Sequence, residues 1–339
     1  MRTRLTTSGA VLERVNDAGG ELSEHRQRMD EFLNFIGASK GDPRRQQNAI
    51  YSSHVLGPAG REVKVILLDT RTQRDPFLHL NIGLGFPAMQ ATWRLVTGQL
   101  CIGGHYGGDM LGEEQWAWLK GQLEGSTAAF HIIVSTVQVF TSCPIAESWG
   151  HFPAARRRLL QLLEATRPRG TMFISGDVHL AELISGIPPA PAIVEIEGNA
   201  KRHAPEREVL EVTSSGLTHS CAGRYGTTLC RTMLNHWNTH RPRAEAYYAW
   251  QNFGSARIDW GGCEEGCDGN GSKADVCAAT ATFNVHDAHG NIVLSTQRSS
   301  CRRWSLGEEG IDSVISVLEH GQCAQNRAFV ASWRSSLLL

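Results

Sequence analysis

The residues with the clearest chemical potential are Asp177 and His179, which stand two positions apart after a short apolar run. Met172, Phe173 and Ile174 predict a buried strand that ends in Ser-Gly, so the turn that follows presents a carboxylate and an imidazole. A hard oxygen and a borderline nitrogen together suit iron, zinc or manganese better than calcium alone. The turn is therefore a candidate metal site, although an Asp-x-His turn held by hydrogen bonds has the same pattern.

Polar side chains follow three further apolar runs in the same way. In open α/β sheets, binding sites form where the carboxyl ends of parallel strands meet, so these side chains are predicted to share one cleft. The four groups are Asp69 and Arg71; Ser135 and Gln138; Asp177 and His179; and Ser214, Ser215 and His219.

The elements that must position these residues alternate between strands and helices, which predicts an α/β layered core. Helical spacing covers residues 21–36, residues 112–123 and a segment from Pro153 to the breakers Pro168 and Gly170. The stretch at 77–108 is rich in glycine, lacks periodicity and indicates an insertion or long loop. Strands are predicted at residues 51–56, 63–68, 132–137, 192–196, 209–212, 256–260, 281–285 and 292–294.

Composition places the chain among ordinary globular proteins and leaves its function to a local site. It has 339 residues, 41% of them hydrophobic and 20% charged, which excludes general disorder. Thirty-three basic residues against 34 acidic ones provide no signature of nucleic-acid binding. No apolar run approaches the ~20 residues of a transmembrane helix.

The nine cysteines indicate an oxidising compartment, since six of them lie in the last third of the chain. Disulfides are the favoured interpretation, and a zinc site at Cys263, Cys267 and Cys277 is the alternative. A secretory or extracellular location follows from this cysteine usage, yet residues 1–5 lack the apolar core of a signal peptide. This conflict predicts that the natural amino terminus lies upstream.

Several sequence blocks together resemble alkaline phosphatase D, the PhoD-like family of calcineurin-type metallophosphatases. The blocks are Leu67–Arg71, Leu111–Leu119, Glu147–Trp149, Ser175–Glu182, Thr213–His219, Asn252–Gly254 and Ile258–Trp260. The resemblance implies a four-layer αββα sandwich of two mixed β-sheets flanked by helices. It assigns residues 15–298 to this domain, with 77–108 as an insertion and 299–339 as a tail of unknown role.

The resemblance also implies the hydrolysis of phosphate monoesters or diesters by a hydroxide that two metal ions activate. The two ions would be divalent or trivalent. They would be either an iron and calcium pair, or zinc or manganese. The substrate would be a phosphorylated small molecule or a phosphodiester.

Site roles follow from the resemblance and from the charge of the phosphate group. Asp177, His179 and Asn16 would bind metal, and Asp17 would stand beside the ligands or the substrate. Arg71 and His219 are the catalytic candidates, because a guanidinium or an imidazole stabilises charge on phosphate oxygens.

Each of these side chains also has a structural interpretation. Arg71 could instead form a salt bridge with Asp69 or Asp75, and His219 could be a hydrogen-bonded structural residue. Gln138 is expected behind the metal ligands, because an amide binds metals poorly. Trp149 is expected either beside the substrate or in the core.

One departure from the family pattern concerns the amino-terminal region. The family places a first metal-binding strand, a Gly-Asp-x-x-Tyr block and a Trp-Asp-Asp-His-Asp block before the segment that here begins at Asn16. The chain is thus expected to correspond to the carboxyl-terminal two-thirds of the enzyme, with an incomplete metal centre and an unpaired sheet edge. The alternative function is a pseudoenzyme or remnant that binds phosphorylated ligands without hydrolysing them.

Overall fold

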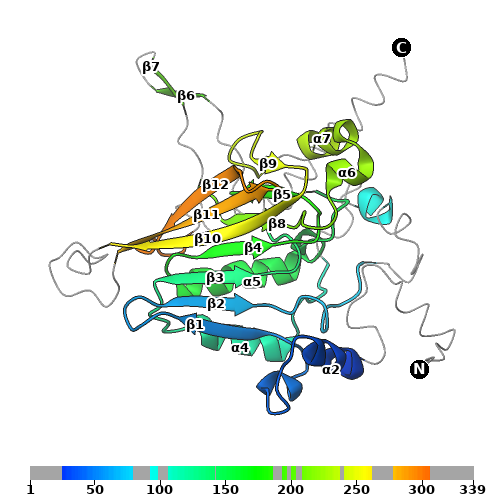
Figure 1. The fold of residues 1–339 in the computed structure, drawn as a ribbon, viewed down its shortest axis with the longest axis vertical. Helices are drawn as coiled ribbons and strands as arrows, with labels where there is room; N and C mark the ends of the chain where they lie inside the picture. Colours follow the sequence, from blue (N-terminus) through cyan, green and yellow to red (C-terminus); the bar gives the residue numbers. More distant parts are fainter. Residues whose placement is uncertain are drawn as a thin grey trace.

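The structure is a computed structural model of the chain. It describes residues 25–78, 92–97, 106–141, 143–185, 193–196, 200–203, 208–236, 240–261 and 278–305. Within these residues the fold is built on one large sheet with helices against one face and a smaller sheet against the other (Figure 1).

The large sheet has seven strands and a mixed topology. Strands β2, β3, β4 and β8 run parallel, β1 is antiparallel to β2, and β5 is antiparallel to both β8 and β9. In spatial order the strands are β1 (Ser52–Leu56), β2 (Val63–Leu67), β3 (Phe130–Val134), β4 (Met172–Ser175), β8 (Glu211–Ser214), β5 (Ala181–Ile184) and β9 (Tyr247–Tyr248). The central parallel strands are rich in buried apolar residues because both faces of the sheet are covered.

The smaller sheet consists of β10 (Asn252–Trp260), β11 (Ala279–Asp287) and β12 (Ile292–Ser299), all antiparallel. Alternate residues of β11, including Ala281, Phe283 and Val285, are buried against the large sheet, as period-two patterning requires. The predicted pair of sheets is confirmed, with the difference that the smaller sheet is antiparallel rather than mixed. The hairpin of β6 (Ile193–Ile196) and β7 (Ala200–His203) is separate from both sheets.

The opposite face of the large sheet is covered by α4 (Glu113–Leu123) and α5 (Pro153–Thr166). Pro153 stands in the first turn of α5, where its missing N–H has no intrahelical partner to lose. Helix α2 (His25–Phe35) and the short turns η1 (Pro43–Arg45) and η2 (Trp149–His151) complete this part of the chain. The described residues therefore form three of the four expected layers. These are the helical layer of α4 and α5, the mixed sheet and the antiparallel sheet.

Two segments that the sequence left unassigned contribute to the core. Residues 92–97 of the expected insertion are helical, and Arg94 and Thr97 are buried there. Trp304 of the expected tail is also buried; its backbone N–H donates to Pro168 O at 2.8 Å and its ring stacks on Phe140. The packed fold therefore extends beyond β12.

Cys221 and Cys230 form a disulfide, which confirms the favoured interpretation for these two cysteines. Cys301 is also disulfide-bonded. Cys263, Cys267 and Cys277 lie outside the described residues, so the choice between disulfides and zinc there stays a prediction. A disulfide is compatible with an extracellular protein. None of the helices in the described ranges has the length and apolarity needed to cross a bilayer.

Candidate functional site

The four groups of polar side chains singled out in the sequence lie at one edge of the large sheet. Strands β2, β3, β4 and β8 are mutually parallel, so the segments that follow them leave the sheet on the same side. Figure 1 shows these strands with their arrowheads at a common edge. This topology brings residues from four separate parts of the chain into one region.

The turn after β4 has an unusual backbone. Asp177 and His179 adopt positive φ values of 71° and 57°, which few residues other than glycine adopt without cost. Such conformations cluster at functional sites, where the surrounding structure maintains them. The turn is held by a hydrogen bond from Val178 N to Gly176 O at 2.9 Å and by one from His179 N to Ser215 Oγ at 2.9 Å. Both Asp177 and His179 are exposed, so a ligand can reach them.

His219 lies beside His179, although 40 positions separate them in the sequence. The two imidazole rings are stacked with centroids 5.9 Å apart and planes inclined by 29°. His219 Nδ1 is 2.9 Å from Thr218 Oγ1, an interaction that fixes the orientation of the ring. The structure therefore places two exposed imidazoles and one exposed carboxylate around the same turn.

The charges around Asp177 come from several segments. Partial desolvation by the surrounding protein raises the pKa of Asp177, and the negative charge of Glu147 raises it further. The positive charges of Arg71, His179 and Arg94 act in the opposite direction. Asp177 therefore lies within the electrostatic field of both the arginines and the acidic residue that they surround.

Arg71 forms a two-point ion pair with Glu147. Arg71 Nη1 lies 3.0 Å from Glu147 Oε1, and Nη2 donates to Oε2 at 3.1 Å. The carboxylate of Asp69 accepts the backbone N–H groups of Arg71 and Thr72 and thereby fixes the turn after β2. The side chain of Arg71 is 42% exposed, which leaves part of it accessible to an anion.

Glu147 is the centre of an arginine cluster formed with Arg71, Arg74 and Arg94. Arg74 is buried and forms an ion pair with Glu147, while Arg94 Nε donates to Ile145 O at 2.9 Å in the same loop. Burial raises the pKa of Glu147, but the charges of Arg74 and Arg71 outweigh it, and the pKa lies below its ordinary value. Two guanidinium groups pair with one buried carboxylate and the charge of Arg94 acts on it as well, so positive charges outnumber the carboxylate in this cluster.

The sequence analysis did not single out Arg74, Arg94 or Glu147 for a role. Arg74 and Glu147 stand within or next to quoted motifs, which was the only available signal. Arg94 had none, because it comes from the stretch at 77–108 that lacked any recognisable pattern.

Gln138 and Trp149 both point into the protein. Gln138 is buried, and its Nε2 donates to Glu182 Oε2 and to Thr213 Oγ1, each at 3.0 Å. Trp149 is fully buried, and its Nε1 donates to Ser135 Oγ at 3.1 Å. Gln138 therefore links buried polar side chains, and Trp149 is a packing residue of the core.

The fit of a metal ion to this region is partial. Asp177 and His179 offer an oxygen and a nitrogen donor that are exposed on one turn. Within the described ranges there is no cluster of three or more His, Cys, Asp or Glu side chains arranged to hold a metal ion. Asn16 and Asp17, the other predicted contributors, lie outside those ranges.

The fold and the site together define a two-sheet α/β protein with an Asp-x-His turn at the carboxyl ends of its parallel strands. The profile of the PhoD-like phosphatase family matches residues 18–265, which is most of the chain. The chain therefore belongs to the PhoD-like phosphatase family, as the sequence blocks indicated.

Comparison with individual proteins gives less detail. No curated protein matches this chain. A solved structure described as "Structure of PhoD" is 12% identical, with a TM-score of 0.47. The match covers 94% of this chain and 59% of that one, so the chain spans less than two-thirds of the length of its structural relative.

Proposed function

We propose that this protein hydrolyses phosphate monoesters or diesters with metal ions bound in part by Asp177 and His179. The observation that carries the proposal is the convergence of Asp177, His179 and His219 on one strained, exposed turn beside a cationic cluster. Membership of a phosphatase family supports the reaction type. When bound, metal ions in such a site polarise phosphate oxygens and make water more acidic.

The arginine cluster is suited to hold the phosphate group. Glu147 fixes Arg71 from one side through both terminal nitrogens, so its guanidinium is oriented before substrate arrives. Buried Arg74 and Arg94 add positive charge around Glu147. A preorganised guanidinium stabilises the charge that spreads over phosphoryl oxygens in the transition state.

His219 is suited to act at the oxygen that leaves. Its Nδ1 interacts with Thr218 Oγ1, so Nε2 is the nitrogen that would donate a proton or a hydrogen bond to that oxygen. His179 stacks against it, and a metal ion on His179 would lie close to the same reacting group.

The test is turnover of p-nitrophenyl phosphate and of bis(p-nitrophenyl) phosphate by the purified chain. Three metal supplements are compared: manganese alone, zinc alone, and iron together with calcium. We expect turnover that a chelator abolishes and that Asp177→Asn and His219→Ala each reduce by at least about 10²-fold. Asp259→Asn, on the exposed outer surface of β10, is the control and should keep full activity.

Absence of turnover under all these conditions would overturn the proposal. Equilibrium dialysis with inorganic phosphate would then decide whether the alternative, a non-catalytic phosphate-binding protein, holds. Binding that Arg71→Ala abolishes would support that alternative.

A further inference from the structure

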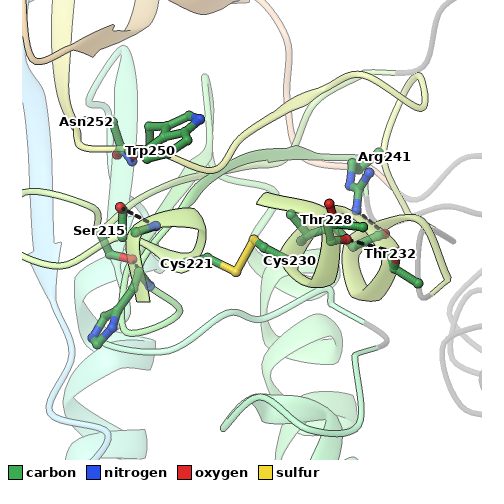
Figure 2. Close-up of a disulfide and its surroundings, with 12 residues drawn as sticks. Ser215, Cys221, Thr228, Cys230, Thr232, Arg241, Trp250 and Asn252 are labelled. Carbon is green, nitrogen blue, oxygen red and sulfur yellow. Dashed lines mark hydrogen bonds between the residues drawn. A yellow bond between two sulfur atoms is a disulfide. The ribbon is translucent and has the colours of Figure 1, made fainter. Parts of the chain in front are cut away.

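The two short helices that follow β8 are joined by the disulfide between Cys221 and Cys230 (Figure 2). Helix α6 (Cys221–Tyr225) has five residues and α7 (Thr227–His236) has ten, with Gly226 between them at a φ of 82°. Helices of this length are marginal on their own in water. They must therefore be fixed by contacts with the rest of the protein.

Helix α7 has little burial to hold it in place. Cys230 is its one buried residue, and its neighbours Leu229 and Arg231 are exposed. The sulfur of Cys230 enters a small apolar cluster with Cys221, Ala222, Leu180 and Ala249. Partly buried Leu234 of α7 packs against the same cluster, and buried Arg241, which pairs with Glu182 on β5, donates to Leu234 O. The disulfide therefore joins α6 to a helix that has its own attachment to the large sheet.

The other end of the disulfide is tied directly to the His179 turn. Cys221 N donates to His179 O at 2.8 Å, and Ala222 N donates to Ala249 O at 3.0 Å. Ser220 caps α6 by accepting the N–H of Gly223 at 3.2 Å, and His219 immediately precedes this cap. A displacement of α6 would therefore move His219 and release the carbonyl of His179 together.

A second bond from the same segment fixes the other side of the turn. His179 N donates to Ser215 Oγ at 2.9 Å, and Ser215 N donates to Leu180 O at 3.1 Å. Residues 215–221 therefore hydrogen-bond to both the N–H and the carbonyl of His179. His219 lies in the sequence between the two residues that make these bonds.

We propose that the Cys221–Cys230 disulfide is a positioning element that holds His219 against His179. The crosslink fixes α6 at its first residue, and α6 in turn sets the backbone of both histidines. This inference rests on the proposed function only in so far as the two histidines act in that site. The positioning of the two histidines by the disulfide does not depend on the proposed function.

The first test is hydrogen–deuterium exchange, followed by mass spectrometry, on the full chain and on Cys221→Ala/Cys230→Ala. We expect the amides of residues 177–181 and 215–225 to exchange at least about tenfold faster in the double variant. Peptides from β3 and β4 should keep their rates. Cys301→Ala, which removes a different disulfide, should leave residues 177–181 unchanged.

Faster exchange confined to α7 would overturn the proposal, because it would show that the crosslink stabilises that helix without affecting the histidines. Unchanged exchange at residues 177–181 and 215–225 would overturn it as well. Manganese titration adds a second readout: the dissociation constant should rise about tenfold or more in the double variant but not in Cys301→Ala.

The same comparison can be made without substitution if the double variant does not fold. Dithiothreitol gives two electrons and two protons to the disulfide, which yields two thiols and the cyclic disulfide of the reagent. Reduced wild-type protein should show the faster exchange at residues 177–181, and reduced Cys301→Ala should show it too. If wild-type protein neither binds manganese nor turns over substrate, the proposed function fails, while the exchange data still decide the positioning role.

Discussion

Glu147 and Arg74 form an ion pair in which both side chains are almost fully buried, with 5% and 1% of their surfaces exposed. Arg71 pairs with the same carboxylate from a more exposed position. Removing one partner of a buried pair leaves the other charged and desolvated, so loss of either side chain should destabilise the loop that carries Glu147. The same loop sets the charge around Asp177.

We expect Glu147→Gln to lower the free energy of unfolding by about 3–5 kcal/mol, the cost of leaving a buried charge without its partner. Glu113→Gln is the matched control, since Glu113 pairs with Arg158 at the surface and is 80% exposed. That exposed pair should contribute little to stability, because solvent screens it. Urea unfolding at pH 7 measures both, and equal losses in the two variants would contradict the prediction.

Arg71 should matter for activity more than for stability, because its side chain is 42% exposed, whereas Arg74 pairs with Glu147 in the interior. We expect Arg71→Ala to reduce kcat/KM by about 10²- to 10³-fold while changing the free energy of unfolding by about 1 kcal/mol at most. Arg257→Ala, at an exposed ion pair on β10, should change neither. A drop in stability that accounts for the lost activity would rule out the catalytic role.

Asp177→Asn should lower the metal content of the purified protein, because an amide is a far weaker ligand than a carboxylate. The side chain is exposed, so the circular dichroism spectrum should be unchanged. Asp259→Asn, at an exposed carboxylate on β10, provides the comparison. Elemental analysis that finds equal metal in wild type and Asp177→Asn would remove Asp177 from the ligand set.

Much of the large sheet could be predicted from the sequence because its strands are short apolar runs bounded by clear breakers. The turn at Gly57–Gly60 joins the two strands predicted at 51–56 and 63–68, which pair antiparallel, and Gly57 and Gly60 both have positive φ. The coincidence of polar residues with strand ends also predicted that the four groups share one edge of the sheet, since parallel strands place all their carboxyl ends together.

What the sequence could not reveal depends on contacts between distant segments. Arg94 donates to Ile145, which lies 51 positions away in a different loop. Helix α7 buries only Cys230, and the pairing of Cys221 with Cys230 cannot be read from spacing alone. Trp304 reaches the core from a segment without periodicity.

Glu211 provides a prediction about pH that is independent of the metal site. Its side chain is fully buried on β8 and accepts N–H groups from Val139 and Phe140. Burial raises the pKa of Glu211 from 4.5 to about 7, although these N–H groups and Ser175 act against the rise. The folded protein therefore retains a proton that the unfolded chain has released between these two pH values.

The direction of the effect follows from this difference in bound protons. The contribution of Glu211 to stability is fully present below pH 4.5, falls as the pH rises toward 7 and is constant above it. A shift of this size corresponds to about 3 kcal/mol at most. Burial lowers the pKa values of His131 and His151 to about 4, so these two histidines act in the opposite direction over the same range.

Comparison of wild type with Glu211→Gln isolates the carboxyl group, because both histidines are present in each protein. The change in the free energy of unfolding from pH 5 to pH 8 should be less favourable for wild type than for the variant, since an amide does not ionise. Urea unfolding at the two pH values gives the difference, and Glu124→Gln, at an exposed position after α4, should behave like wild type. Equal pH dependence in wild type and Glu211→Gln would show that Glu211 titrates as an ordinary carboxyl group in the folded protein.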